Sequence, residues 1–115
     1  MVPMLIKIRT TTLAITLLGS LLAINNTQAQ TIFACEPEWA ALTRVLLPEA
    51  RLHVATHAQQ DPHHIEARPT LIAQLRSADS AICTGASLES GWLPTLQQRS
   101  GNPRMQNGAP GLFFA

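Results

Sequence analysis

The sequence of 115 residues has few of the features that mark nucleic-acid-binding proteins. Aromatic residues make up 4% of the chain, tyrosine is absent, and the formal net charge is only +1. Proteins that bind nucleic acid normally carry a basic surface or aromatic side chains on which bases stack. We therefore expect no nucleic-acid partner. The chain also lacks internal repeats and low-complexity segments, which argues against a repeat architecture.

The first 29 residues have the features of a secretory signal peptide. Lys7 and Arg9 supply a positive start, residues 13–24 form an apolar run, and Thr27–Ala29 resembles a cleavage site with small residues. The apolar run is shorter than the roughly 20 residues that a membrane-spanning helix needs. We therefore expect export and a mature chain that begins near Gln30, with an uncleaved membrane anchor as the alternative.

Short apolar runs alternate with helical patterns along the rest of the chain. This alternation is typical of a parallel sheet with right-handed crossover helices. We predict an α/β fold, a partial Rossmann-like lobe with three parallel strands over residues 30–103, and a loop-like tail over residues 104–115. The expected strands are Thr31–Cys35, Arg51–His57 and Ala78–Thr84.

The first helix is predicted to begin at Glu36-Pro37-Glu38 and to end at Pro48. Glu36 and Glu38 are interpreted as residues that favour a helix start, rather than as metal ligands. Apolar residues recur at helical spacing along this segment, and we expect them to face the sheet. These residues are Trp39, Leu42, Val45 and Leu46.

The segment Asp61-Pro62-His63-His64-Ile65-Glu66 gathers two imidazoles and two carboxylates between the second strand and the next helix. Imidazole nitrogen binds zinc and other transition metals, and a nearby carboxylate can ligate the ion or orient the ring. Pro62 stiffens the turn that presents His63. In an extended segment adjacent side chains point to opposite sides, so we expect only one ring to face a site. The alternative is a polar surface loop without a ligand.

Several segments resemble the zinc/manganese substrate-binding proteins that supply ABC importers. The Asp-Pro-His segment of that family corresponds to Asp61–Thr70. Its first strand resembles Ile32–Pro37, and its next strand and turn resemble Ala78–Glu89. Gly91–Pro94 and Ser100–Pro103 follow in the same order. The resemblance therefore covers nearly all the chain after the leader.

The resemblance implies that His63, which directly follows Asp-Pro, is a metal ligand. It assigns no such role to His64. Glu66 is a candidate outer-shell partner or simply a helix-start residue, and His57 lies near enough to a strand end to line the site.

The other ligands of that family lie in later segments and in a second lobe, and this sequence ends at Ala115. We therefore expect a truncated form with an incomplete metal site. The resemblance implies that the parent is a periplasmic protein that binds Zn²⁺, or Mn²⁺, and delivers it to an ABC permease in the inner membrane. Such a binding protein neither makes nor breaks a covalent bond, so we expect no enzymatic activity.

If the strand order across the sheet is second, first, third, Cys35 and Cys83 lie at the ends of neighbouring strands. Export places both thiols in an oxidising compartment, so we predict a disulfide between them. The alternative is that the two thiols serve as soft metal ligands.

Two other functions are alternatives to metal transport. An exported metallohydrolase would use His63 and His64 as ligands and Glu66 to activate water. The two-histidine helical motif of zinc proteases is absent, and a catalytic zinc usually takes three protein ligands. An inactive remnant is the other alternative, because so short a chain buries a modest fraction of its surface.

Overall fold

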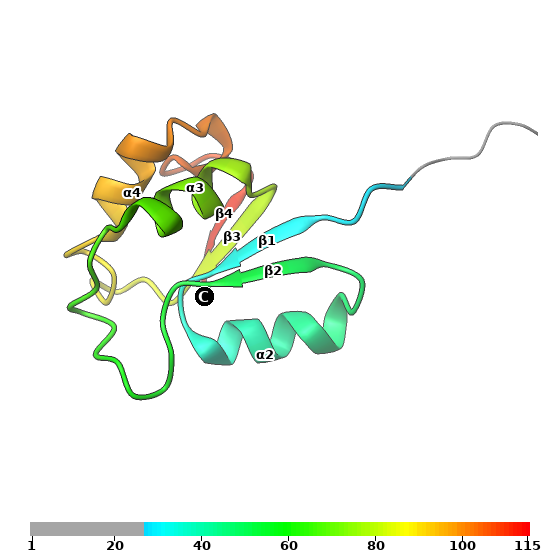
Figure 1. Ribbon diagram of the computed structural model, residues 1–115, viewed down its shortest axis with the longest axis horizontal. Helices are drawn as coiled ribbons and strands as arrows, with labels where there is room; N and C mark the ends of the chain where they lie inside the picture. Colours follow the sequence, from blue (N-terminus) through cyan, green and yellow to red (C-terminus); the bar gives the residue numbers. More distant parts are fainter. Residues whose placement is uncertain (1–26) are drawn as a thin grey trace, which may run out of the picture.

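A computed structural model describes residues 27–115 (Figure 1). The predicted signal peptide, except for its last three residues, lies outside the described part of the chain. No helix in residues 27–115 has both the length and the apolar character needed to cross a membrane. The elements are β1 (Thr31–Ala34), α2 (Pro37–Leu46), β2 (Arg51–Val54), α3 (Pro69–Ser77), β3 (Ser80–Cys83), α4 (Leu93–Ser100), a 3₁₀ turn η1 (Pro103–Met105) and β4 (Leu112–Phe114).

The strands form one parallel sheet in the order β2-β1-β3-β4. Ile32 pairs with Leu52 on one side and with Ser80 on the other. The predicted α/β class is confirmed, and the first three strands have the order on which the expected disulfide depends. The chain leaves β1 toward one edge and returns to its other side at β3, so the switch point of the topology lies between these two strands. Ligands of such sheets collect at the carboxyl end of the strands near that point.

The fourth strand corrects the prediction that residues 104–115 are loop-like. Ala81 pairs with Leu112 and Cys83 with Phe114, so β4 extends the sheet beyond the predicted three strands. Gly111 makes this pairing sterically feasible, because a Cβ there would lie 2.8 Å from the Arg104 carbonyl oxygen. Three apolar residues among glycine and proline are too short a run to show strand periodicity in the sequence.

The helices cover the two faces of the sheet unequally. In Figure 1, α3 and α4 lie over one face, whereas α2 lies on the other face beside β1 and β2. The core is formed mainly under α3 and α4, where large side chains are almost fully buried. Its largest members are Trp92, Phe33, Leu71, Leu75, Leu96 and Met105.

The predicted orientation of α2 is wrong for Leu42, Val45 and Leu46. Trp39 does turn toward the sheet, because its indole N–H donates to the hydroxyl of Thr84, which follows β3, at 2.9 Å. Ala40 and Thr43 are its buried residues, while Val45 is 78% exposed and Leu46 is 66% exposed. The apolar stripe of this helix is broad, and periodicity alone does not tell which part of a broad stripe meets the sheet. The outward part of α2 and the edge strand β4 therefore carry exposed apolar side chains. These are Leu42, Val45, Leu46, Leu47, Phe113 and Phe114.

Candidate metal centre

The segment between β2 and α3, which we call the histidine loop (residues 57–68), leaves the sheet at its carboxyl end (Figure 1). Two turns shape it: the Gln60 N–H donates to the His57 carbonyl at 2.9 Å, and the His64 N–H donates to the Asp61 carbonyl at 3.0 Å. Pro62 lies inside the second turn and restricts its backbone. The histidine loop thus holds His63 and His64 where a ligand of a parallel sheet is expected.

The Asp61 carboxylate is the centre of the histidine loop. Its Oδ1 accepts a hydrogen bond from the His63 backbone N–H at 3.0 Å and lies 2.8 Å from His63 Nδ1. Its Oδ2 lies 2.9 Å from His64 Nδ1. The backbone hydrogen bond from His63, followed by the two side-chain contacts, holds the pKa of Asp61 well below its usual range. The carboxylate therefore stays ionised and orients both rings.

A neutral ring that donates its Nδ1–H to a carboxylate has its lone pair on Nε2, and this is the form that binds a metal. His63 and His64 both place Nδ1 against the same carboxylate. The side chains are 60% and 82% exposed, so both rings are largely open to solvent. This arrangement fits zinc as an ion held by imidazole nitrogen, with Asp61 as the outer-shell partner.

The expectation that the two rings point to opposite sides assumed an extended backbone. The structure has a turn at this position, and it brings both rings onto Asp61 with their centroids 6.3 Å apart. The assignment of His63, rather than His64, as the ligand rests on the resemblance and stays a prediction.

The histidine loop is anchored to the beginning of α4. The Trp92 indole N–H donates to the Pro62 carbonyl at 2.7 Å, and Trp92 is 1% exposed. Gly91 approaches the same turn so closely that a Cβ would lie 2.9 Å from the His63 carbonyl oxygen. Ile65 is buried in the core beneath the loop. The backbone on both sides of His63 is therefore fixed by distant residues.

The other two predicted neighbours lie farther from this centre. Glu66 is exposed, and among residues 27–115 its carboxylate makes no hydrogen bond or ion pair with His63 or His64. His57 is exposed and lies 3.3 Å from the Gln59 side chain through Nδ1. It borders a hollow of about 310 Å³ beside the start of α2, together with Pro62 and Glu36.

A second group of candidate ligands is buried at the ends of β1 and β3. The predicted disulfide is present: Cys35 and Cys83 are bonded, with their Cα atoms 4.8 Å apart. A carboxylate oxygen of Glu89 belongs to the same cluster, in which the ligand atoms lie within 4.8 Å of one another. Within the described residues, this is the group that brings three metal-ligating side chains together; the histidine loop does not.

Glu89 closes the turn that follows β3. It is 2% exposed and accepts hydrogen bonds from the Thr84 N–H at 2.7 Å and the Gly85 N–H at 2.9 Å. The sequence pattern assigns Glu89 no ligand role. Its position six residues after the end of β3 is the available signal, because a carboxylate there can reach back to free backbone N–H groups.

Glu36 lies against Glu89 and is also 2% exposed. Its Oε2 accepts a hydrogen bond from the Thr84 hydroxyl at 3.0 Å, whereas its Oε1 has no hydrogen-bond partner among the described residues. Burial, together with the neighbouring Glu89 carboxyl, raises the pKa of Glu36 to about 7. Glu36 does precede α2 as predicted, but its side chain makes no capping hydrogen bond and turns into the cluster instead.

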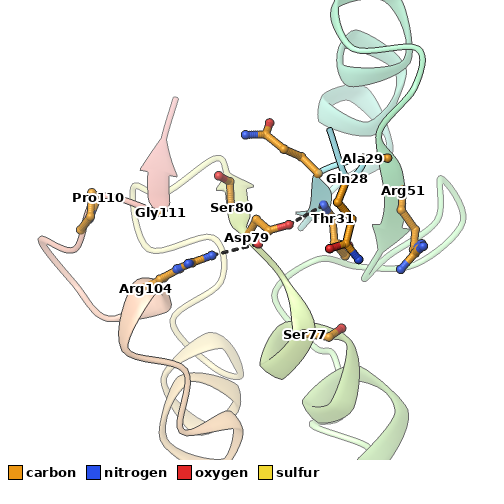
Figure 2. Close-up of a pocket in the computed structure, with 11 residues that line it drawn as sticks. Gln28, Ala29, Thr31, Arg51, Ser77, Asp79, Ser80, Arg104, Pro110 and Gly111 are labelled. Carbon is orange, nitrogen blue, oxygen red and sulfur yellow. Dashed lines mark hydrogen bonds and ion pairs between the residues drawn. The ribbon is translucent and has the colours of Figure 1, made fainter. Parts of the chain in front are cut away.

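The largest hollow, about 560 Å³, lies at the opposite end of the sheet (Figure 2). Figure 2 shows Asp79 at its centre, bonded to the Arg104 guanidinium at 2.9 Å and to the Thr31 N–H at 2.8 Å. The hollow is bordered by the residues that precede β1 and β3. Because Asp79 is already paired and ligands collect at the other end of parallel strands, this hollow is not the candidate site.

Comparison with solved structures identifies the fold. One neighbour is a deletion mutant of ZnuA with zinc bound, at 25% sequence identity and a TM-score of 0.59. The lobe is ZnuA-like. A second ZnuA structure matches at 26% identity and a TM-score of 0.55. No family model matches the chain, and no curated protein matches it either.

The two ZnuA matches each cover 65% of this chain but only 29% and 30% of the ZnuA chains. The ZnuA-like lobe therefore spans less than a third of the length of these neighbours.

Proposed function

We propose that this chain is the N-terminal lobe of a periplasmic substrate-binding component of a zinc importer, with manganese as the alternative cargo. The observation that carries the proposal is the geometry of His63. Its Nδ1 lies 2.8 Å from an ionised carboxylate, its backbone is fixed by Pro62 and Gly91, and its side chain is 60% exposed at the carboxyl end of the sheet. The likeness to a zinc-bound ZnuA structure supports the same assignment.

His63 alone is a weak site for a divalent ion. It lies shortly before the N-terminus of α3, where the helix dipole disfavours a cation. The carboxylate of Asp61 offsets this effect while it orients the ring. We propose that further ligands come from parts of a longer protein outside this lobe, and that closure of two lobes around the ion completes the site.

Imidazole and carboxylate donors suit zinc, whereas manganese prefers a site richer in oxygen. The described lobe contributes an imidazole, which favours zinc over manganese as the cargo. The signal peptide predicted for residues 1–29 would place the protein in the periplasm, and an ABC permease of the inner membrane would receive the ion. No step in this function makes or breaks a covalent bond.

Zinc titration of the oxidised full chain by calorimetry near pH 7 tests the proposal. We expect weak binding of one ion, on the order of micromolar or weaker, that His63→Ala abolishes. His64→Ala is the matched control, because this ring touches the same carboxylate, and it should retain most of the affinity. Equal losses from both variants would contradict the assignment of His63, and so would unchanged binding by His63→Ala.

A further inference from the structure

The buried cluster at the ends of β1 and β3 has the composition of a metal site of its own. The sulfur atoms of Cys35 and Cys83 and a carboxylate oxygen of Glu89 lie within 4.8 Å of one another, and all three side chains are buried. Glu36 follows Cys35 directly, and its Oε2 lies 3.3 Å from the Thr84 N–H that also donates to Glu89. Two sulfur atoms and the Glu89 carboxylate therefore lie close together, and the Glu36 carboxylate borders this group through their shared neighbour Thr84.

The two carboxylates have no cationic partner among the described residues. The acidic members of the ion pairs within residues 27–115 are Asp61 and Asp79, and none of these pairs involves Glu36 or Glu89. Glu36 is 2% exposed, and within the described part of the chain its Oε1 is buried without a hydrogen-bond partner, whereas its Oε2 accepts from Thr84. A buried carboxyl oxygen without a partner is unfavourable, because burial removes the water that would otherwise solvate it. A cation at this position would supply the missing partner.

We propose that Cys35, Cys83, Glu89 and Glu36 bind one zinc-like divalent ion when the disulfide is reduced. A dithiol reductant supplies two electrons and two protons, which break the S–S bond and give two thiols, while the dithiol itself becomes a disulfide. Metal binding then releases the two thiol protons, because thiolate sulfur is the ligand, together with any proton carried by the Glu36 carboxyl group. Two thiolates and two carboxylate oxygens make a four-coordinate set that suits zinc or cadmium. Oxidation removes the thiolates and closes the site.

The fold favours this assembly in several ways. β1 and β3 are adjacent strands, so the two cysteines remain neighbours after the S–S bond is broken. Glu89 is already held in place by Thr84 and Gly85. Glu36 borders the hollow of about 310 Å³ beside Pro62, which gives the cluster a route to solvent. The proposed ligands do not include His63 or His64, so this site is independent of the proposed transport function.

Cadmium titration of the full chain tests the proposal, because thiolate-to-cadmium charge transfer produces an ultraviolet absorption band. The experiment uses the double variant His63→Ala/His64→Ala, which removes the histidine loop as a competing site. We expect the reduced chain to bind one cadmium ion with a charge-transfer band and the oxidised chain to show none. Zinc should displace the cadmium and abolish the band. No band in a reduced chain that retains its circular dichroism spectrum overturns the proposal.

The carboxylates are tested by Glu36→Gln and Glu89→Gln in the same background. Each should weaken cadmium binding by at least the roughly tenfold that loss of an outer-shell partner costs. Glu89→Gln also disturbs the turn after β3, so Glu36→Gln is the decisive variant if Glu89→Gln does not fold. Glu38→Gln changes an exposed glutamate two residues away and is the matched control. Unchanged affinity in Glu36→Gln would mean that the thiols bind without it, which overturns the four-ligand site.

Discussion

The exposed histidine loop and the buried cysteine–glutamate cluster both contain a carboxyl group, but one lies in a solvent-exposed and the other in a buried environment. Asp61 in the loop is surrounded by a backbone N–H and two imidazoles, which lower its pKa. Glu36 in the cluster is buried beside a second carboxyl group, and its pKa is raised to about 7. One carboxyl group therefore stays ionised and orients ligands, while the other retains a proton or requires a cation.

This difference shows why proximity in the sequence is a poor guide to a metal site. The histidine loop has its candidate ligands within four consecutive residues, but they converge on a carboxylate and not on a common ion position. The cluster draws its members from positions as far apart as 54 residues, and they meet because β1 and β3 are neighbours.

The disulfide should make the largest contribution to stability. Loss of Cys35–Cys83 through the double substitution Cys35→Ala/Cys83→Ala is expected to lower the free energy of unfolding by about 2–5 kcal/mol, since it releases a loop that spans 48 residues. Urea unfolding followed by circular dichroism measures the change. Identical urea midpoints for the wild-type and double-variant chains would show that the bond adds nothing to the fold.

Glu36 should make stability depend on pH. Its folded pKa of about 7 lies above the ordinary 4.5, so the folded chain keeps a proton that the unfolded chain loses. The free energy of unfolding should therefore fall as the pH rises from about 4.5 to 7, by up to about 3 kcal/mol. Glu36→Gln should flatten this slope, whereas Glu38→Gln should keep it. A slope that survives in Glu36→Gln would assign the dependence to another group.

Asp61 should matter for metal affinity through the orientation of His63. Asp61→Asn replaces an ionised acceptor with a neutral one, so zinc affinity should fall by about 10–100-fold. Calorimetric titration of the oxidised chain measures the change. Glu66→Gln is the matched control, because its exposed carboxylate does not touch the imidazoles, and it should leave the affinity unaltered. An equal loss of zinc affinity in both variants would mean that the negative charge of the loop matters for binding, and not the contact between Asp61 and the His63 ring.

Trp92 should fix the backbone of the histidine loop. Trp92→Phe keeps most of the buried ring but removes the hydrogen bond to the Pro62 carbonyl, at a cost of about 1 kcal/mol in unfolding free energy. The rate of backbone amide hydrogen exchange should increase more in the histidine loop than in β1. An equal increase in the histidine loop and throughout the sheet would mean that Trp92 stabilises the core as a whole and does not specifically fix the loop.

The outward face of α2 should be the least sensitive region. Val45 is 78% exposed, so Val45→Gln is expected to change the unfolding free energy by no more than about 0.5 kcal/mol. Leu75→Ala on α3, at a fully buried position, should cost about 2–5 kcal/mol in the same urea assay. Comparable losses of unfolding free energy in the two variants would show that the outward face of α2 is buried against another surface.

The sequence predicts the parallel α/β class because alternating apolar runs and helical patterns follow general rules. Export and an assumed strand order predict the disulfide. The sequence does not predict β4, whose three residues are too few for periodicity, or the inward face of α2, which depends on packing. An extended backbone at Pro62–His64 would separate the two rings, whereas the turn there brings both imidazoles onto Asp61. The pairing of Glu36 with Glu89 depends on side-chain rotamers, which sequence patterns do not encode.

The most direct test of the account concerns the two nitrogen atoms of His63. Long-range ¹H–¹⁵N spectra of the oxidised, ¹⁵N-labelled chain distinguish Nδ1 from Nε2 during zinc addition. The account predicts that zinc shifts Nε2 of His63 first and leaves its Nδ1–H bonded to Asp61. A shift at Nδ1, or a His63 ring that does not respond while another histidine does, would contradict it.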